Sequence, residues 1–503
     1  MSCPASKAAT PDRAGPITCP GPRAPPQPAC RAASRRWLPI GGRPPRRGQP
    51  PRAAGSIKGR SGVGRRARRG GERSVARARL LASAPWVLGL SVAIHLVVTG
   101  CPPVSSLIDL RVYREAAPEV LTGGLYDFRL VDPGDASFPL PFTYTPFAAL
   151  LFLPLSALPW PVVVGLWQAS SLLCLWLLVH SALSLVDSVD PGTRRSAALL
   201  WTSAALWLEP VRTTLNYGQV NLFLAASVWT ALTRRGAALP GAAVGLAAAV
   251  KLTPAVAGLC LVATRRWHAA AWSLATFAAT VALGWLAAPE ESRRFWFQLL
   301  GDAGRVGPVG SAINQSLRGA LSRSLGADVG WSLPWWGAVL AVGALAAVAA
   351  RAALRRDDPV AVVLAVQLFG LLASPVSWSH HWVWVVPALV WLTSAPTRSA
   401  VRGAGPVAGA WLLASAGYVV SWLLVAQPSI WEIPRPWPLS ALGWAYPACA
   451  VLTLVVMATT RRGDRHRARA AEGTTGVRRG AAGPSSDSSP PVSEGPAGGA
   501  SPS

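Results

Sequence analysis

An acid and two arginines follow the first long apolar stretch of the chain, in the segment Asp109-Leu-Arg-Val-Tyr-Arg-Glu115. At helical spacing, Asp109 and Tyr113 lie on one face of a short helix. Arg111 and Arg114 lie on another. A carboxylate beside an orienting partner can act as a general base, and arginines can bind an anion. The same residues also fit a solvated helix at a membrane boundary, so spacing alone leaves both interpretations open.

A polar break separates two apolar stretches between residues 208 and 221. Gln219 and Asn221 offer uncharged donors and acceptors of the kind that bind sugar hydroxyls, and Arg212 offers a phosphate partner. A capped helix start uses the same residue types without any ligand. The break therefore predicts either a sugar-binding loop or a simple helix boundary.

Lys251 is the only lysine after Lys58, and it interrupts an apolar run just before Leu-Thr-Pro254. Ionisable side chains at membrane depth usually face a polar cavity or a ligand, which predicts an anionic headgroup beside Lys251. The alternative is a lysine whose long side chain extends to the membrane interface and keeps its charge in water.

Two adjacent histidines, His380 and His381, precede another apolar run. Imidazoles there can donate to a phosphate or orient a carboxylate. Asn314, in the polar segment 313–318, is a weaker candidate for substrate binding, and it also begins an Asn-x-Ser sequon. The histidines lack His-x-x-x-His or Glu-x-x-His spacing, and the seven cysteines show no Cys-x-x-Cys pair. We therefore expect no metal, no cofactor and no disulfide framework.

The elements that position these residues are predicted to be membrane-spanning helices. Hydrophobic residues make up 51% of the 503 residues and charged residues only 14%, against about 25% charged in soluble domains. Apolar runs long enough to cross a bilayer recur between residues 81 and 460, so we predict an all-α polytopic membrane domain. The candidate spans are 81–99, 142–158, 160–183, 196–209, 218–233, 238–250, 253–264, 267–288, 333–354, 359–373, 381–395, 404–425 and 440–459.

Arginines set the expected topology, because basic loops stay in the cytoplasm. Pairs follow or separate many spans, at Arg194/Arg195, Arg234/Arg235, Arg265/Arg266, Arg355/Arg356, Arg398 with Arg402, and Arg461/Arg462. With both termini inside, the number of crossings is even, so we expect about twelve helices and a half-spanning segment at 142–158 or its neighbour. The polar segments 101–141, 289–334 and 426–438 then face outside, together with the candidate site.

The two ends of the chain carry most of its net charge of +26. Residues 1–80 hold 19 Lys and Arg against 2 acids, and residues 461–503 hold 7 against 4. Neither end shows apolar periodicity, so both are expected to be disordered cytoplasmic tails. Basic tails beside a membrane usually contact anionic lipid headgroups, and we therefore expect membrane lipids rather than nucleic acid as their partners.

Seven short motifs in a fixed order resemble glycosyltransferase family 87 over about residues 80–460. They are Asp109-Leu-Arg-Val-Tyr113, Thr122-Gly-Gly-Leu-Tyr-Asp127, Phe142-Thr-Tyr-Thr-Pro146, Asn216-Tyr-Gly-Gln-Val-Asn221, Lys251-Leu-Thr-Pro254, Asn314-Gln-Ser-Leu-Arg318 and Ser374-Pro-Val-Ser-Trp-Ser-His-His381. The resemblance implies a C-type glycosyltransferase (GT-C) membrane fold with an outward-facing site. It also implies that Asp109 is the essential acid and that His380 or His381 lies near the donor phosphate.

The resemblance further implies a hexosyltransferase of the cell membrane that transfers a sugar from a polyprenyl-phosphate donor to a glycolipid or cell-wall glycan. Mannose is the sugar that the family leads us to expect. Asp109 would be the general base of an inverting reaction. Two alternatives remain at this point. A lipid or sugar transporter also needs many helices and a few buried polar groups, and an O-antigen ligase or polymerase would rely on an outer-loop His/Arg pair instead of Asp109.

Overall fold

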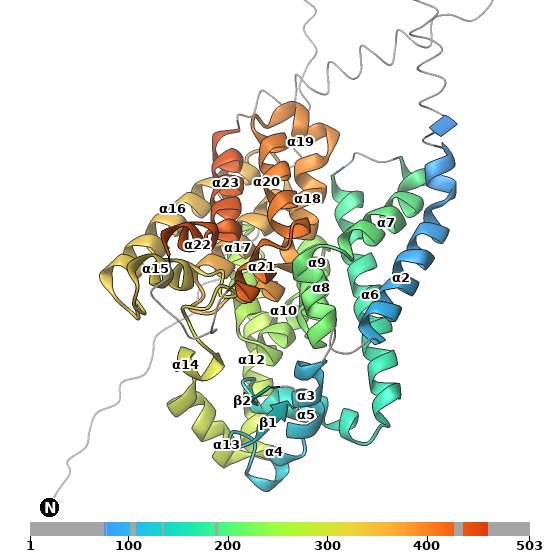
Figure 1. The fold of residues 1–503 in the computed structure, drawn as a ribbon. Coiled ribbons are helices and arrows are strands. Elements are labelled where there is room, and N and C mark those ends of the chain that lie inside the picture. Colours follow the sequence, from blue (N-terminus) through green and yellow to red (C-terminus); the bar gives the residue numbers. More distant parts are fainter. Residues whose placement is uncertain are drawn as a thin grey trace, which may run out of the picture. The chain divides into compact units, whose positions relative to one another are not determined.

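The computed structural model describes residues 75–76, 78–100, 107–132, 135–186, 190–426 and 436–460. The expected tails, most of 1–80 and all of 461–503, lie outside the described residues. The described part is mostly helical, as predicted (Figure 1). Its principal helices are α2 (Ala84–Gly100), α6 (Trp160–Leu185), α7 (Pro191–Ala205), α9 (Asn221–Thr233), α10 (Ala238–Val250), α12 (Trp267–Ala287), α16 (Leu333–Leu354), α17 (Pro359–Ala373), α18 (Val385–Thr393), α20 (Ala404–Ala416) and α23 (Ala445–Thr459).

Four stretches are long and apolar enough to cross a membrane, namely α6, α12, α16 and residues 404–425. Shorter apolar helices of 10–17 residues accompany them. In lipid every backbone polar group needs an internal partner, which is why such uniformly apolar sequence forms helices. The membrane character of the chain is confirmed, while the count of about twelve crossings stays a prediction.

Several expected spans are interrupted at Pro, Gly or polar residues. The span expected at 253–264 consists of a 3₁₀ turn, η1 (Thr253–Val256), and α11 (Ala257–Ala263). Residues 404–425 bend between α20 and α21 (Val419–Val425), where Tyr418 has a φ of 52°. The segment expected to be half-spanning contains α5 (Pro146–Ser156), which at 1.5 Å per residue is roughly 16 Å long, about half of a bilayer core.

Helices α10 and α12 pack against each other and lie side by side (Figure 1). Glycines of α10 make the approach possible, since a Cβ added at Gly241 would collide with the carbonyl oxygen of Ala269. Gly245 lies equally close to the carbonyl oxygen of Ser273. Small residues at such contacts are typical of helix packing in membranes. This packing fixes α10, whose end carries Lys251.

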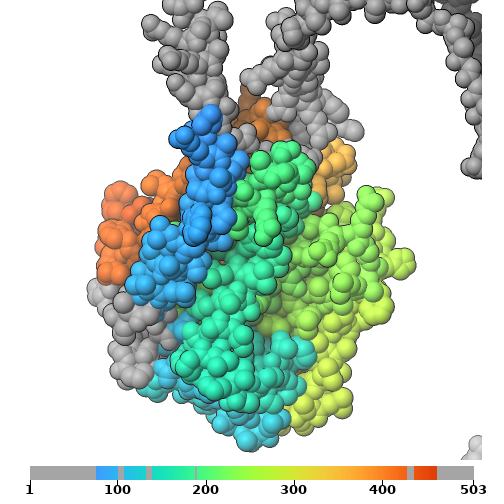
Figure 2. Space-filling model, turned by 90° about the vertical axis from the view of Figure 1, so that its right-hand side faces the viewer, coloured from blue at the N-terminus to red at the C-terminus, as the bar shows by residue number. Residues whose placement is uncertain are grey.

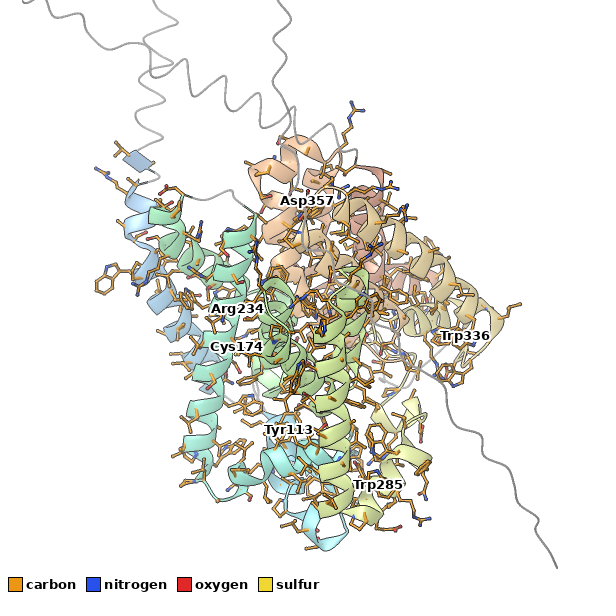
Figure 3. The ribbon with its side chains drawn as sticks, turned by 180° about the vertical axis from the view of Figure 1, so that it is seen from behind. Tyr113, Cys174, Arg234, Trp285, Trp336 and Asp357 are labelled. Atoms are coloured by element: carbon orange, nitrogen blue, oxygen red, sulfur yellow. The ribbon has the colours of Figure 1, made fainter. Side chains whose placement is uncertain are left out.

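Figure 2 views the face formed by α2, α6 and α7, in which α2 and α6 each contact α7. Figure 3 shows large aromatic side chains at the periphery, among them Trp336 of α16 and Trp285 of α12. The Trp336 side chain is 45% exposed although it is apolar. Tryptophans in such positions suit the boundary between lipid and water.

Short elements fill the polar segments between the spans. They are α3 (Ile108–Ala116), α4 (Glu119–Thr122), β1 (Arg129–Asp132), β2 (Asp135–Pro141), α8 (Glu209–Tyr217), α13 (Pro289–Arg294), the π-helical turn η2 (Phe295–Leu299), α14 (Ala303–Val306), α15 (Leu317–Leu325), the 3₁₀ helix η3 (Ser379–Trp384), α19 (Ala395–Ala400) and α22 (Trp437–Leu442). Two of these are strands, so the prediction of an all-α chain was wrong in detail.

The strands β1 and β2 pair antiparallel, with Leu130 opposite Leu140. Between the two strands the sequence reads Asp132-Pro-Gly-Asp135, a turn signal that hydropathy analysis overlooks. The hairpin contacts α3 and lies at the same end of the helices (Figure 1). Pro141, at the end of β2, lines the cavity described below.

Candidate active site

A cavity of about 690 Å³ opens where the short polar elements meet the ends of the long helices. This volume is within the usual range for small-molecule sites, roughly 300–1,000 Å³. Its polar lining residues come from distant parts of the sequence. They are Asp109, Thr143, Tyr144, Thr145, Tyr217, Gln219, Lys251, Thr253, Asp302, Arg305, Ser374, His380 and His381. Five of the eleven site residues predicted from the sequence therefore meet at one place.

Asp109 lies on the first turn of α3 and borders the cavity with a half-buried side chain. Burial disfavours the charged carboxylate and raises the pKa of Asp109 to about 6. A hydrogen bond from Gln219 and the charge of Lys251 oppose this rise without cancelling it. A carboxylate with such a pKa is still mostly ionised at neutral pH and is a stronger base than an ordinary aspartate.

Two tyrosines orient the amide of Gln219. The hydroxyl groups of Tyr113 and Tyr144 lie 2.7 Å apart, and each donates to Oε1 of Gln219 over 3.0 Å. Because both hydroxyls meet the amide oxygen, the amide nitrogen is the group left to donate to Asp109. Tyr113 is fully buried and stacks on Phe152, with ring centroids 4.6 Å apart. This packing fixes the side of Asp109 from which the hydrogen bond comes.

The backbone of α3 lies directly against the end of α8. Leu107, just before α3, donates its N–H to the carbonyl of Asn216 over 3.0 Å. Gly218 ends α8 with a φ of 69°, a conformation that favours glycine. A Cβ at Gly218 would lie 2.5 Å from Cβ of Leu110, closer than real atoms approach. The short distance between Asp109 and Gln219 thus depends on a glycine at position 218.

Lys251 occupies the break between α10 and η1, where Pro254 starts the 3₁₀ turn and the backbone of Lys251 is extended. Its Nζ lies 2.9 Å from Nε2 of His381, 3.1 Å from Oδ1 of Asn221 and 3.4 Å from the Tyr144 hydroxyl. The same ammonium group lies 5.3 Å from the centre of the Tyr144 ring. These contacts hold a cation on the cavity wall rather than at the lipid interface.

The two histidines sit on η3 and border the cavity together. The backbone carbonyl of His380 accepts hydrogen bonds from Asn221 Nδ2 (2.9 Å) and from the Thr214 hydroxyl (3.0 Å). The His380 ring packs edge-on against Tyr217 at 5.6 Å. Asn221 therefore binds η3 with its amide nitrogen and Lys251 with its amide oxygen, so it positions two cavity residues without lining the main cavity.

Other predicted residues lie away from the cavity. Arg111 pairs with Glu115 over 3.3 Å, and Arg114 donates to the carbonyl of Leu158 over 3.1 Å. Arg212 contacts Nδ1 of His95 on α2, and its guanidinium stacks on the Trp207 ring. Arg114 and Arg212 therefore connect their short helices to neighbouring segments, whereas the pair of Arg111 lies within α3.

The side chain of Asn314 also forms its hydrogen bonds with backbone groups of the protein. Its Nδ2 donates to the carbonyls of Val309 and Pro375, while its Oδ1 accepts from the N–H groups of Ser316 and Ser377. It is fully buried and joins the segment before α15 to the segment before η3. A contact between Asn314 and a substrate is not supported by this geometry.

Arg305 and Tyr144 are cavity residues that sequence reasoning did not select. Arg305 belongs to α14, donates from Nη2 to the carbonyl of Phe142 over 2.8 Å and stacks on the Tyr126 ring at 5.1 Å. It adds a second cation to the lining. Tyr144 was noted only within a motif. The sequence shows Arg305 only as one of several arginines in the polar segment 289–334, and nothing local distinguishes it from the other arginines there.

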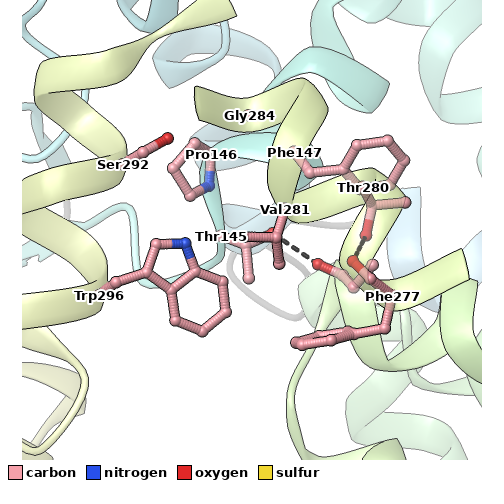
Figure 4. Close-up of a pocket in the computed structure, with 10 residues that line it drawn as sticks. Thr145, Pro146, Phe147, Phe277, Thr280, Val281, Gly284, Ser292 and Trp296 are labelled. Atoms are coloured by element: carbon pink, nitrogen blue, oxygen red, sulfur yellow. Dashed lines mark hydrogen bonds between the residues drawn. The ribbon is translucent and has the colours of Figure 1, made fainter. Parts of the chain in front are cut away.

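A narrow apolar slot lies beside the cavity, between α5, α12 and the α13–η2 segment (Figure 4). Its volume is about 10 Å³, room for at most one water molecule, so it does not hold a sugar. Thr145 lines both the slot and the main cavity. Among the described residues, no group of three or more His, Cys, Asp or Glu side chains is arranged to hold a metal ion.

A carboxylate with a raised pKa and two basic side chains line a cavity at the ends of membrane-type helices, an arrangement that suits a membrane-embedded enzyme. The family model for glycosyltransferase family 87 matches residues 142–375. This range contains Gln219, Asn221 and Lys251, whereas Asp109 and the two histidines lie outside it.

Curated relatives extend the match. The chain is 43% identical over 397 residues to a polyprenol-phosphate-mannose-dependent alpha-(1-2)-phosphatidylinositol pentamannoside mannosyltransferase of Mycolicibacterium smegmatis, covering 77% of this chain and 94% of that protein. The protein of the same description from Mycobacterium tuberculosis is 43% identical over 396 residues, with 78% and 90% covered. A phosphatidylinositol mannoside mannosyltransferase of Mycobacterium tuberculosis is 34% identical over 284 residues, 53% of this chain and 66% of that protein.

The chain belongs to glycosyltransferase family 87 and is a glycosyltransferase. No solved structure matches it. Membership of an enzyme family favours the expected sugar transfer over the transporter alternative.

Proposed function

We propose that this enzyme transfers mannose from a polyprenyl-phosphate donor to a phosphatidylinositol mannoside on the outer face of the cell membrane. The observation that carries the proposal is 43% identity to a mannosyltransferase with this donor and acceptor class, across 94% of that relative's length. The cavity supports it, because an ionised acid and two cations suit an attack by a hydroxyl group on a phosphate-linked sugar.

In the proposed reaction Asp109 is the general base. Its carboxylate accepts the proton of an acceptor hydroxyl while that oxygen forms a bond to the anomeric carbon of the donor sugar. The bond between this carbon and the phosphate oxygen breaks, and its electron pair leaves with polyprenyl phosphate. Attack opposite to the leaving group inverts the anomeric configuration. Gln219 donates a hydrogen bond from its amide to Asp109, and this bond keeps the carboxylate directed toward the acceptor substrate.

Positive charge on the cavity wall assists the departing phosphate. Lys251 is the cation nearest the histidines, and His381 contacts it directly. Arg305 provides a second positive charge in the same lining. Preorganised donors directed at developing charge are usually a large contribution to catalysis. Because a phosphate monoester already leaves readily, the reaction needs no separate general acid, in contrast to glycoside hydrolysis.

The proposed topology is a GT-C fold with about twelve crossings, both termini in the cytoplasm and the cavity toward the outside. Helix α10 supports this orientation. It begins next to the arginine-rich turns, where Arg266 donates to the carbonyls of Leu232 and Gly236, and ends at Lys251 in the cavity. Its 13 residues span roughly 20 Å, so arginines on the cytoplasmic side would leave Lys251 in the outer half of the membrane, which supports an outward-facing cavity.

Metal independence is part of the proposal, since Lys251 and Arg305 offer the positive charge that a cation would otherwise supply. An O-antigen ligase or polymerase is the remaining alternative among enzymes that use polyprenyl-linked sugars. That reaction would need an outer-loop His/Arg pair in place of Asp109. The location of Asp109 on the cavity wall, next to Lys251, favours the family 87 reaction.

A transfer assay with defined substrates tests the proposal. Purified enzyme in vesicles receives polyprenyl-phosphate mannose, glucose or arabinose, each with phosphatidylinositol mannosides as acceptors, and products are analysed by mass spectrometry and linkage analysis. We expect an α-1,2-linked mannose with the mannose donor and at least ten-fold less product with the other two donors. Asp109→Asn serves as the inactive control. Equal use of another sugar would contradict the donor assignment, and a product on a different lipid would contradict the acceptor assignment.

A further inference from the structure

A second cavity of about 40 Å³ lies next to His381. It has room for about two water molecules. Its walls come from α9, η1, α17 and the segment around η3. His381 and Thr253 line both cavities and thus form the partition between them.

Three residues that line this second cavity each have a buried side-chain atom with no hydrogen-bond partner among the described residues. The atoms are Nδ1 of His381, Nε2 of Gln367 and Oγ of Ser377. Gln367 is 4% exposed and Ser377 is fully buried. Buried polar atoms in folded proteins nearly always have a partner, either protein or ordered water. Three residues with such atoms around one small cavity point to a shared partner.

The contact with Lys251 determines which nitrogen of His381 carries the proton. Burial lowers the pKa of Lys251 to about 7, and in its protonated form the lysine has three donors and no acceptor, so Nε2 of His381, 2.9 Å from Lys251 Nζ, then accepts. The proton of the neutral imidazole then resides on Nδ1, the nitrogen that has no hydrogen-bond partner among the described residues. This N–H group needs an acceptor, and a water molecule is the acceptor that fits the space.

We propose that the second cavity binds an ordered water that accepts from His381 Nδ1–H and Gln367 Nε2–H and donates to Ser377 Oγ. Water has two acceptor and two donor positions, so one molecule satisfies all three atoms. Gln367, in the middle of α17, is therefore a positioning residue: it acts on the main cavity only through the water and His381.

This inference rests on the proposed role of Lys251 at the donor phosphate. With the water in place, His381 keeps Nε2 available and Lys251 stays between His381, Asn221 and Tyr144. Without it, the imidazole can move its proton to Nε2, and two donors then face each other at Lys251. The ammonium group moves away from its position, and binding of the phosphate-linked donor weakens.

Two variants each remove one hydrogen-bonding partner of the proposed water. Gln367→Met keeps the volume but removes the amide, while Ser377→Ala removes only the unpartnered hydroxyl and leaves the backbone bonds of Ser377 to Gln315 and Asn314 intact. Leu364→Met is the matched control, because Leu364 is a fully buried residue of α17 that lines neither cavity. If Gln367→Met does not fold, Ser377→Ala carries the test.

We expect each of the two variants to raise the KM for the polyprenyl-phosphate donor about five-fold, the size expected for one lost hydrogen bond, with kcat changed less than two-fold. The control keeps the wild-type values. Nitrogen NMR of enzyme labelled with ¹⁵N-histidine reads the tautomer directly: His381, assigned through His381→Gln, carries its proton on Nδ1 in wild type and shows a mixed population in the variants.

An unchanged His381 tautomer in both variants would overturn the inference. So would an unchanged donor KM in both when the enzyme transfers mannose. If no variant and no wild-type sample transfers mannose, the proposed function fails, but the NMR measurement still decides whether Gln367 and Ser377 control His381. The two failures are therefore distinguishable.

Discussion

Two of the acidic side chains on short helices, Glu209 and Asp109, have different surroundings in the described structure. Glu209, at the start of α8, is fully buried. Its carboxylate accepts from the backbone N–H groups of Val420 and Ser421, from the Ser421 hydroxyl at 2.6 Å and from the Tyr446 hydroxyl at 2.8 Å. These four donors occupy its lone pairs, so Glu209 fixes α8 to α21 and α23.

Asp109 instead borders the main cavity and is bound from one side by Gln219. Its carboxylate faces space large enough for a substrate. The comparison teaches that burial of an acid does not by itself indicate catalysis. An acid whose donors all come from the protein holds the fold together, whereas an acid that faces a cavity can exchange a proton with a ligand.

The largest expected effect is that of Asp109→Asn. An amide cannot accept the acceptor's proton, so we expect transfer to fall about 100- to 10,000-fold, the range for loss of a general base. The measurement is initial-rate transfer with matched amounts of folded enzyme. Glu115→Gln makes the same change of charge on the same helix, away from the cavity, and should stay within about two-fold of wild type. Equal rates for the wild type and Asp109→Asn would remove the base from the mechanism.

Lys251→Met tests the cation that distinguishes the surroundings of Asp109 from those of Glu209. Loss of a charge-assisted contact to the donor phosphate should lower kcat/KM for the donor about 10- to 100-fold. Arg293→Gln is the control, because Arg293 is an exposed cation paired with Glu290 in the outer segment. A similar loss in both variants would indicate a general effect of surface charge instead of a specific phosphate contact.

The raised pKa of Asp109 predicts an acid limit of activity near pH 6. The protonated carboxyl is inactive as a base, so activity falls as pH drops through the pKa, to about one tenth of its maximum at pH 5. Transfer is measured in vesicles equilibrated with an ionophore on both sides. Lys251→Met should move this limit to higher pH, because the lysine charge lowers the pKa. An acid limit near pH 4 in both enzymes would contradict the burial of the base.

Glu209→Gln should affect stability and leave chemistry nearly unchanged. The amide NH₂ cannot accept from the donors that surround Glu209, so we expect a loss of about 1–3 kcal/mol of unfolding free energy. Thermal unfolding in detergent should show a lower Tm, while transfer per folded molecule stays within about two-fold. Glu290→Gln, on the exposed surface, provides the comparison. A large loss of specific activity at full folding would assign Glu209 a role in the reaction.

The smallest expected effect is that of metal removal. Treatment with EDTA should leave the transfer rate unchanged, since the proposed reaction draws its positive charge from Lys251 and Arg305. The check is the rate before and after chelation, and again after addition of Mg²⁺ or Mn²⁺. A loss on chelation that either ion restores would replace the protein cations with a bound metal in this mechanism.

Long apolar runs were the most predictable part of the fold. The expected spans 333–354 and 359–373 coincide with α16 and α17. Their bounds follow from local sequence, because a chain in lipid must satisfy its backbone hydrogen bonds within each helix. The hairpin of β1 and β2 was missed, since its pairing depends on a short turn signal in a polar segment and not on hydropathy.

The candidate site was predictable as a set of residue types but not as an arrangement. Lys251 and His381 are 130 positions apart, and nothing local in the sequence shows that they touch. Arg212 and Arg305 are both arginines in polar segments, yet only Arg305 lines the cavity. The difference arises from tertiary packing: Arg212 contacts His95 of α2, while α14 brings Arg305 to the cavity.

Gly218 takes no part in the reaction itself, but it determines how closely the backbone segments that carry Asp109 and Gln219 approach each other. The missing side chain lets two backbones touch, and this contact sets the spacing between the acid and its amide partner. A methyl group there would act as a spacer, leaving every reactive group present but out of register. Gly218→Ala is thus a tool for making an enzyme that retains its substrates without turning them over, which is the form needed to capture donor and acceptor together.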